Sequence, residues 1–534
     1  MNRKHAINTF IKRSLAAALA ALIMLPAAAG AEAAAQSGKD AILASRHLYE
    51  LRLYAGTGEM EWRDGAASQA AFRGPAALLP YKGGLLVADA GNQRIRSIQD
   101  GKVTTRVGQD LGTDGLGLLM GALHDGTKGE AMFQTPAGMG AAPDGSVVIA
   151  DVDNHAIRRL DATGKVTTIA GDGRIGLRDG KAEGARFHHP QAVAVASDGT
   201  IYVADTLNHV IRRIQDGQVT TLNAAASRAI EYFPGVADMA GDYADGPLAS
   251  AKFNEPSGLA LDQQGNLYVS DTGNQRIRYI DLSRGTVTTV AGGSQVVYER
   301  NAAYAEGGYA DGLAHNARFR APRGLAVTPS GGLLIADSLN HAIRYLADGQ
   351  VTTLAGVAGE AGSLDGIAAY ASLKRPVDVA VLADGTIAIA DLGNNLVRTL
   401  APYTLPAGFT AGDTVQLLYN QTIIRSDIAP VIRKGMTFVP LRVLAEKLGY
   451  EVNYTGGAAS ISREGVVYTV KEGSNQIVKL IAGKQAETVQ LQAAVTVSSG
   501  RMLVPVRFFA EEAGLDVQWL GSQNAVLVRE RYSK

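Results

Sequence analysis

The sequence predicts a mainly β chain, in which a closed ring of small sheets is followed by a smaller α+β domain with an internal duplication. Three observations lead to this prediction. A phrase with Asp, Asn and Arg at fixed positions occurs six times between residues 89 and 398. Each copy lies among short segments with period-two patterning, which is typical of strands. A second, unrelated motif occurs twice after residue 412.

The repeated phrase reads DTLNHVIRR from Asp205 and DTGNQRIRY from Asp271. Upstream, a Pro opens a segment such as PQAVAVASDGTIYVAD, and this Pro lies 15 residues before the Asp in five copies and 14 in the first. A Phe or Leu stands three residues before each Pro, and an Asp-Gly pair stands eight residues earlier still. Each unit therefore holds about four short strands. Four-stranded units repeated around an axis form a β-propeller, and six copies predict six blades.

The last copy ends at Pro402, one strand short of the others. The missing strand is expected at the other end of the propeller, because the segment from Leu48 to Phe72 aligns with the segment from Lys165 to Phe187. An N-terminal strand would then complete the last blade and close the ring. Closure leaves no long sheet edge open for pairing with another chain.

The six copies of D-x-x-N-x-x-[IV]-R, together with the preceding P-x-G-[LV]-A-[VL] strand, resemble NHL repeats over about residues 48–403. The resemblance implies a six-bladed propeller and, most often, a recognition role. A catalytic motif is normally needed once, so we interpret the repeated residues as structural. The Asp is expected to accept hydrogen bonds, the Asn to adopt a left-handed turn, and the Arg to pair with an Asp. These residues are Asp89, Asn92, Arg96, Asp151, Asn154, Arg158, Asp205, Asn208, Arg212, Asp271, Asn274, Arg278, Asp337, Asn340, Arg344, Asp391, Asn394 and Arg398.

A binding face is expected where the turns and the variable loops between blades meet, since loops on a rigid scaffold often carry function. Long insertions lie at residues 109–129, 224–243 and 294–308, and the last two bring several tyrosines to this face. These tyrosines suit recognition of a peptide or sugar, or else pack the loops onto the propeller. The candidate ligand-binding residues are Gln191, Ser257, Arg323, Asp378, His155, His209, His341, Tyr232 and Tyr304.

Neither a metal site nor a cofactor is predicted. His155, His209 and His341 occupy equivalent positions on different blades, and metal–nitrogen bonds of about 2 Å cannot join such a ring to one ion. Some six-bladed propellers are metal-dependent lactonases or lyases, which place ligands on the innermost strands. Those strands are almost entirely small and apolar here, apart from Gln191, Ser257, Arg323 and Asp378. The sequence therefore favours a binding protein over an enzyme, with an extracellular hydrolase or lyase as the alternative.

The C-terminal motif pairs MTFVPLRVLAEKLGYEVNY from Met436 with MLVPVRFFAEEAGLDVQW from Met502. Each half is expected to form a strand, a short helix, a Gly stop and a second strand. Over about residues 412–531 this motif resembles the copper amine oxidase N-terminal-like domain, which acts as a stalk in the enzymes that name it. The resemblance does not imply copper, because no His follows His341. Arg442 and Glu446, and likewise Arg507 and Glu511, are expected to form a surface or packing pair rather than a site.

The first 35 residues are expected to be a signal peptide, with basic residues before the short apolar segment from Ser14 to Leu25 and small residues after it. The domains would then be the propeller at 48–403, a linker at 404–411 and the α+β domain at 412–534. With formal net charge +0 and no basic stripe, nucleic acid is not an expected partner. The prediction is a secreted or envelope-associated protein that recognises a protein, peptide or cell-wall glycan, with no membrane span in the mature chain.

Overall fold

The computed structural model describes residues 48–293 and 295–530, apart from the side chains of Tyr232, Ala510 and Glu511. The predicted signal peptide lies outside the described residues. Up to Pro402, the described chain forms six sheets of four or five antiparallel strands. From the outermost to the innermost strand, the first three sheets are β2(Gly65–Ala66)-β6(Lys102–Val107)-β5(Arg94–Gln99)-β4(Gly84–Asp89)-β3(Pro75–Tyr81), β10(Val166–Ala170)-β9(Ala156–Leu160)-β8(Val147–Asp151)-β7(Pro136–Ala141), and β11(Gly180–Lys181)-β15(Gln218–Thr221)-β14(Val210–Gln215)-β13(Ile201–Asp205)-β12(Pro190–Val195).

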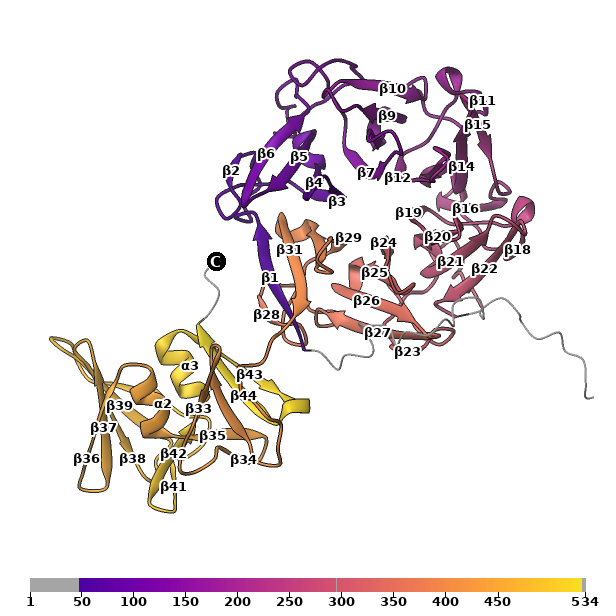
Figure 1. Ribbon diagram of the computed structural model, residues 1–534. Coiled ribbons are helices and arrows are strands. Elements are labelled where there is room, and N and C mark those ends of the chain that lie inside the picture. The colour runs from indigo at the N-terminus through magenta and orange to yellow at the C-terminus, as the bar shows by residue number, and fades with distance from the viewer. Residues whose placement is uncertain (1–47, 294, 531–534) are drawn as a thin grey trace, which may run out of the picture. The chain divides into compact units, whose positions relative to one another are not determined.

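The next three sheets follow the same order of strands. They are β18(Gly246–Pro247)-β22(Thr286–Ala291)-β21(Arg276–Asp281)-β20(Leu267–Asp271)-β19(Pro256–Leu261), β23(Gly312–Leu313)-β27(Gln350–Ala355)-β26(Ala342–Ala347)-β25(Leu333–Asp337)-β24(Pro322–Val327), and β28(Gly366–Ile367)-β1(Tyr49–Ala55)-β31(Leu396–Pro402)-β30(Ile387–Asp391)-β29(Pro376–Val381). The innermost strands β3, β7, β12, β19, β24 and β29 each contact the next, and β29 contacts β3. The sheets therefore form a closed ring, the β-propeller predicted from the repeats (Figure 1).

Strand β1 closes the ring. It comes first among the described strands, yet it pairs antiparallel with β31, with Leu51 opposite Leu400 and Tyr49 opposite Pro402. In Figure 1 the indigo arrow of β1 lies beside the orange arrow of β31. The predicted closure by an N-terminal strand is confirmed. The two distant ends of the propeller are thus joined by backbone hydrogen bonds within one sheet.

Neighbouring sheets are held together by apolar side chains that meet between them. Phe187, which is fully buried, packs in one such cluster with Val148 and Ile157 of the preceding sheet and with Val203 and Val219 of its own. Phe72, Phe133, Phe253 and Phe319 are buried at the equivalent positions. Because each Phe removes roughly 150–250 Å² from water, these residues account for much of the cohesion between sheets.

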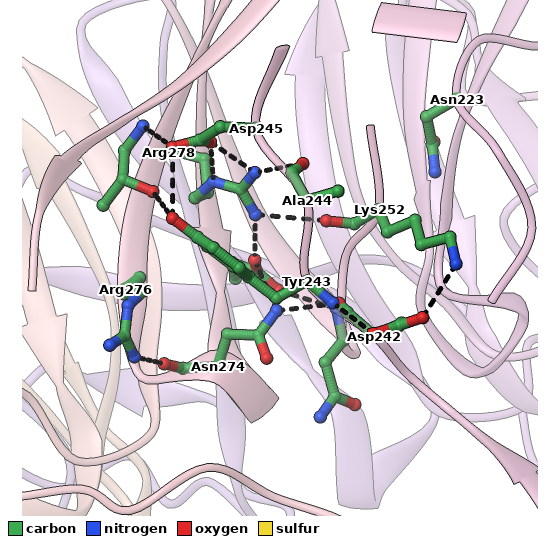
Figure 2. A network of polar contacts seen from close by, with 12 residues as sticks. Asn223, Asp242, Tyr243, Ala244, Asp245, Lys252, Asn274, Arg276 and Arg278 are labelled. Carbon is green, nitrogen blue, oxygen red and sulfur yellow. Dashed lines mark hydrogen bonds and ion pairs between the residues drawn. The ribbon is translucent and has the colours of Figure 1, made fainter. Parts of the chain in front are cut away.

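The repeated Arg is the largest fully buried side chain in each sheet. Arg212 donates through Nη1 to Asp205 Oδ2 at 2.7 Å and through Nη2 to Asp179 Oδ1 at 2.7 Å. Its guanidinium lies 4.9 Å from the ring centroid of Phe187. Burial raises the pKa of Asp205 to about 6, although the Arg212 charge opposes the rise, so this carboxylate is ionised at neutral pH. Figure 2 shows the corresponding network around Arg278.

The prediction that the turn Asn adopts a left-handed conformation is wrong. Asn208 ends a single turn of 3₁₀ helix, Thr206–Asn208, and the next residue, His209, has φ 58°. The Asn208 amide donates to Asp205 Oδ2 at 2.8 Å and to the Gly176 carbonyl at 2.9 Å, so its side chain ties the turn to the preceding loop. The same correction applies to Asn92, Asn154, Asn274, Asn340 and Asn394, which precede Gln93, His155, Gln275, His341 and Asn395 with φ between 51° and 59°.

After Pro402 the chain builds an α+β domain from three sheets and two short helices. The sheets are β33(Thr422–Ile424)-β32(Gln416–Tyr419)-β44(Ala525–Glu530)-β43(Leu515–Leu520), β34(Val431–Arg433)-β35(Met436–Pro440)-β42(Arg501–Pro505)-β41(Thr496–Ser498), and β36(Glu451–Thr455)-β37(Ala458–Arg463)-β38(Val466–Lys471)-β39(Gln476–Ile481)-β40(Glu487–Gln490). The predicted duplication is seen in β35–α2(Leu441–Lys447)–β36 and β42–α3(Arg507–Ala513)–β43. No helix in the described part of the chain is long and apolar enough to cross a membrane.

Candidate binding face of the propeller

One end of the propeller, here called the loop face, gathers three sets of residues. Pro190 at the start of the innermost strand lies opposite Asp205 in the strand register, so the strand starts and the turns are at the same end. The Asn208 amide contacts the Gly176 carbonyl, which brings the loop between sheets to that end as well. The candidate residues Gln191, Ser257, Arg323 and Asp378 follow such prolines by one or two positions. They therefore open onto the loop face.

A hydrogen bond joins each sheet to the next at this face. The backbone N–H of Glu255, just before Pro256, donates to Nδ1 of His209 in the preceding sheet at 3.1 Å. Glu255 has φ 48°, which turns its N–H towards the preceding sheet. We call these contacts the joint hydrogen bonds. The other five run from the N–H of Thr135 to Gln93, of His189 to His155, of Ala321 to Gln275, of Arg375 to His341, and of Gly74 to Asn395.

The three turn histidines, proposed from the sequence as ligand-binding, thus have a structural role. His155, His209 and His341 accept the joint hydrogen bond through Nδ1, which requires that nitrogen to be unprotonated. Burial, followed by the charges of Arg228 and His188, lowers the pKa of His209 to about 4. Burial is also the main cause that lowers the pKa of His155 and of His341. All three imidazoles are therefore neutral at pH 7.

Three histidines from two neighbouring sheets lie together on the loop face. The ring centroid of His155 is 5.0 Å from that of His189 and 6.0 Å from that of His188. The sequence showed that His188 and His189 are adjacent but not that His155 joins them, because the joint between the sheets makes that contact. Within residues 48–293 and 295–530, no three His, Asp or Glu side chains are placed to hold one metal ion.

Residues of all six innermost strands line a cavity of about 100 Å³ on the propeller axis, among them Gln191, Ser257 and Asp378. The fourth candidate, Arg323, reaches this group by donating from Nη1 to Gln191 Oε1 at 3.3 Å. The Ser257 hydroxyl is 2.5 Å from that of Thr272. The structure therefore brings together four polar residues from strands that are far apart in the sequence.

Asp378 occupies a position where the other sheets have Gly or Ala. Its Oδ2 accepts a hydrogen bond at 2.7 Å from the N–H of Leu78, across the seam between the last and first sheets. Gly324 makes room for it, because a Cβ there would lie 2.1 Å from Asp378 Oδ1. Burial raises the pKa of Asp378 to about 7, against the two backbone hydrogen bonds that favour its ionised form. Its charge therefore changes close to neutral pH.

Glu255 and Tyr304 form a second polar pair on the loop face. The Tyr304 hydroxyl donates to Glu255 Oε1 at 3.0 Å, and burial raises the pKa of this carboxyl. The positive charge of Arg323 lowers the pKa of the Glu255 carboxyl and so opposes the effect of burial. Arg323 therefore lies near the Glu255–Tyr304 pair. Sequence reasoning found Tyr304 but missed Glu255 and Arg375. Both are the residue before a repeat Pro, a position whose significance appears only once the joints are seen.

Most of the loop tyrosines pack the insertions onto the propeller. The guanidinium of Arg228 lies 3.7 Å from the ring centroid of Tyr298, and Tyr243 and Tyr309 stack on Arg278 and Arg344 at 4.5 and 4.6 Å. Tyr243 is seen over Arg278 in Figure 2. Tyr304 is half-exposed, at 50%. The side chain of Tyr232 lies outside what the structure describes.

The insertion at 224–243 forms a hairpin of β16(Arg228–Phe233) and β17(Val236–Ala240). The hairpin exposes apolar side chains: Phe233 is 71% exposed and Val236 56% at its tip, and Met239 51% nearer its base. Arg228 fixes its base, where it donates to the Ala302 and Ala303 carbonyls next to Tyr304. A rigidly held apolar hairpin therefore stands beside the Glu255–Tyr304 pair.

The α+β domain has a pocket of its own, of about 360 Å³. The Arg442 guanidinium lies 4.9 Å from the ring centroid of Tyr454, and Arg501 pairs with Asp427 at 2.6 Å on the same pocket wall. Arg442 also lies 3.8 Å from Glu446, the surface pair that the sequence predicted. An exposed aromatic ring flanked by charged and hydrogen-bonding groups is suited to a polar ligand.

The family model described as NHL repeat matches residues 187–214 and 253–278, and that described as copper amine oxidase N-terminal domain matches residues 418–528. The chain carries NHL repeats and a copper amine oxidase N-terminal domain. Both resemblances drawn from the sequence are thereby confirmed. The first matched NHL repeat contains His188 and His209, and the second contains Asn254, Glu255 and Ser257, so the loop face is partly built from the matched segments.

Curated relatives match a part of this chain and a part of their own chains. The chain is 34% identical over 175 residues to the Arabidopsis thaliana protein SUPPRESSOR OF QUENCHING 1, chloroplastic, which covers 30% of this chain and 15% of that protein. It is 26% identical over 340 residues to NHL repeat-containing protein 2 of Bos taurus, which covers 59% of this chain and 44% of that protein. The chain therefore spans less than half the length of these relatives. Among solved structures, an auxiliary nutrient binding protein from Bacteroides thetaiotaomicron is similar at 15% identity with TM-score 0.47, over 67% of this chain and 77% of that one.

Proposed function

We propose that this protein is a secreted or envelope-associated binding protein, and not an enzyme. Its NHL propeller recognises an extracellular protein, peptide or cell-wall glycan through the loop face. Its copper amine oxidase N-terminal domain serves as a stalk or envelope attachment. The observation that carries this proposal is the exposed β16–β17 hairpin, with Phe233 71% exposed at its tip. The hairpin lies on the same face as the mouth, by which we mean the polar opening of the axial cavity formed by Gln191, Ser257, Arg323 and Asp378.

The arrangement supports binding for two physical reasons. Large exposed apolar residues next to fixed polar groups are typical of interaction sites. The joint hydrogen bonds and the Arg228 contacts hold the face in place before a ligand arrives, which lowers the entropy cost of association. The NHL repeats themselves supply this rigidity, and the insertions supply what differs from one sheet to the next.

The test is a ligand screen with the full chain against peptide and glycan arrays, repeated with the variant Phe233→Ser/Met239→Ser. A ligand of the loop face should bind this variant about tenfold or more weakly, because two exposed anchors are removed. The matched control is Leu116→Ser, which removes an apolar side chain that is 86% exposed on a different insertion. A ligand whose binding is equally strong in all three proteins would contradict recognition through this hairpin.

The attachment role is tested separately on the pocket of the α+β domain. Co-sedimentation of the full chain with purified peptidoglycan should be reduced by Tyr454→Ala and by Arg442→Gln, which remove the ring and the cation of that pocket. Lys471→Ala, an exposed residue at the end of β38, serves as the control. Equal sedimentation of the pocket variants and the control would argue against attachment through this pocket.

One observation favours an extracellular hydrolase or lyase as the second candidate. Asp378, with a pKa raised to about 7 on the propeller axis, has the proton affinity that a general acid or base requires. Its carboxylate is engaged by the Leu78 N–H, which is a structural use of the same group. Turnover of a bound ligand that is lost in Asp378→Asn while binding is retained would establish the catalytic alternative.

A further inference from the structure

We propose that the mouth of the axial cavity is a carboxylate subsite, in which Arg323 binds the carboxylate of a peptide, either its C-terminus or an acidic side chain. This inference rests on the proposed binding function and adds the chemistry of the ligand. The inference depends on three observations: the hydrogen bonds and ion pairs of Arg323, the size of the neighbouring cavity, and the residues around the rim of that cavity.

Arg323 differs from the six repeat arginines in its partners. Arg212, for example, is fully buried and pairs with two carboxylates, those of Asp205 and Asp179. Arg323 is only partly buried, and among the described residues no carboxylate is within ion-pair distance of its guanidinium. The one hydrogen bond that its guanidinium makes in the described structure is the long contact of 3.3 Å to Gln191. A partly desolvated cation without an ion-pair partner is less stable than a paired one, so this position is suited to receive an anion.

The charges around Arg323 are of both signs: the neighbouring Arg375 adds to its attraction for an anion, and the Glu255 carboxylate opposes it. Burial and the neighbouring Arg375 both act to lower the pKa of Arg323, which shows that a second cation lies near it. The pKa of His341, on the same rim, is lowered in part by the charges of Arg375, Arg320 and Lys374. Two or more cations near one mouth raise the local concentration of anionic groups.

The size of the cavity limits what can enter. The cavity of about 100 Å³ between the six innermost strands is lined by Gln191, which contacts Arg323, and by Asp378. This volume admits a carboxylate and its nearest carbon atoms but is too small for a sugar ring. Gly258 and Gly324 keep this space narrow, because the strands approach so closely that a Cβ at Gly258 would lie 2.0 Å from the Arg323 carbonyl oxygen. The planar fork of a guanidinium matches the two oxygens of a carboxylate.

The rim favours a peptide as the bearer of that carboxylate. Glu255, held by the Tyr304 hydroxyl, places an acceptor for peptide N–H groups close to Arg323. The negative charge of Asp238 in β17 acts to raise the pKa of both His188 and His209. The hairpin therefore lies at the same rim. The hairpin presents Phe233, Val236 and Met239, an aliphatic and aromatic surface suited to apolar side chains of a peptide.

The experiment uses two probes of nearly equal size, N-acetylglycine and N-acetylglycinamide, of which only the first carries a carboxylate. Binding to the full chain is measured by saturation-transfer NMR and calorimetry at pH 7. We expect the acid to bind about tenfold or more tightly than the amide, as a charge-assisted hydrogen bond implies. Arg323→Gln should abolish this preference and Arg323→Lys should retain part of it.

The control is Arg284→Gln, which removes an exposed arginine outside the mouth and should leave the preference unchanged. Thermal unfolding of Arg323→Gln is followed in parallel to show that the variant folds. Equal binding of acid and amide, an unchanged preference in folded Arg323→Gln, or no binding of either probe at about 20 mM would each overturn the proposal. The array ligand that depends on Phe233 is measured separately, so recognition through the hairpin can hold even where the carboxylate subsite is refuted.

Discussion

The backbone N–H of Glu255 donates to Nδ1 of His209, 3.1 Å away, and this bond joins the third sheet of the propeller to the fourth. Gln93 and Gln275 accept the equivalent bond through Oε1 at two other joints, and Asn395 accepts it through Oδ1 at the seam. The six joints therefore use one geometry with three residue types. The three histidines can no longer accept this bond once Nδ1 is protonated. The two glutamines and the asparagine accept it through amide oxygens, which do not titrate in the same way.

The first prediction concerns the pH dependence of the His209 joint. Because the folded pKa is about 4 and the unfolded value is about 6.5, the unfolded chain binds a proton first as pH falls. The stability that His209 contributes is complete above about pH 6.5 and is lost as pH falls through about 4. His209→Gln should therefore be more stable than the natural protein at pH 5 by about 1–2 kcal/mol, relative to their difference at pH 7.

Urea unfolding at both pH values measures this difference. The reciprocal variant, Gln275→His, is the matched control and should acquire the acid sensitivity that His209→Gln loses, because it places an imidazole at an equivalent joint. An identical change in stability between pH 7 and pH 5 for His209→Gln and the natural protein would show that this joint is not the titrating element.

The second prediction concerns the buried Arg212–Asp205 pair. Arg212→Met should reduce the free energy of unfolding by about 3–5 kcal/mol, because it leaves Asp205 buried without its cation. The double variant Arg212→Met/Asp205→Asn should recover part of this loss, since the unpaired charge is removed. Chemical denaturation of both proteins measures the effect, with Arg284→Gln expected within about 0.5 kcal/mol of the natural protein. A loss below about 1 kcal/mol in Arg212→Met would contradict the assigned role.

The third prediction concerns the packing between sheets that is repeated around the propeller. Phe187→Ala should destabilise the propeller by about 3–5 kcal/mol through the cavity that it creates. Phe187→Leu should cost about 1.5 kcal/mol or less, because Leu373 fills the equivalent position in the last sheet. Differential scanning calorimetry of the two variants measures both values. Equal destabilisation by Ala and Leu would indicate that ring packing on Arg212, rather than volume, determines the effect.

The fourth prediction concerns Asp378. Its folded pKa of about 7 exceeds the unfolded value of about 3.9, so the folded protein keeps a proton that the unfolded chain releases. The stability from protonated Asp378 is complete below about pH 4 and is lost as pH rises through about 7. Asp378→Asn, which stays neutral, should gain about 1–3 kcal/mol over the natural protein between pH 4.5 and pH 8.

Unfolding curves at several pH values measure this gain. The control is Asp348→Asn, which changes an exposed Asp after β26 and should leave the pH profile of the natural protein unchanged. A profile for Asp378→Asn that is parallel to the natural one from pH 4.5 to pH 8 would mean that Asp378 is already ionised throughout that range in the folded protein.

Much of the propeller could be predicted from the sequence because its signals are local and repeated. The six copies give the strand order, and the alignment of Leu48–Phe72 with Lys165–Phe187 gives the closing strand. The Asn assignment failed for an equally local reason. Two positions of the turn accept a left-handed conformation in principle, and hydrogen bonds from the Asn208 side chain to Asp205 and to the preceding loop decide between them.

The candidate site was predicted only in part. Gln191, Ser257, Arg323 and Asp378 could be found because polar residues interrupt apolar inner strands. Glu255 could not, since the residue before a repeat Pro is Gly, Thr, His, Ala or Arg elsewhere and shows no chemical pattern. The sequence predicted that His155, His209 and His341 bind a ligand, because histidine side chains in turns are common in binding sites. Their role as hydrogen-bond acceptors at the joints could not be predicted, since it depends on a backbone N–H from the next sheet.

The sequence by itself determined the repeat, the order of the strands, the closing strand and the duplicated α+β domain, because each depends on residue periodicity and on spacing along the chain. Only the tertiary structure decided which residues meet across the joints. It placed Arg323 beside Gln191, 132 positions away, and without a carboxylate partner among the described residues. It also set His155 against His189 and brought Tyr304 to Glu255. Contacts between sheets depend on the closure of the ring, which fixes the distance from one innermost strand to the next and has no counterpart in local sequence.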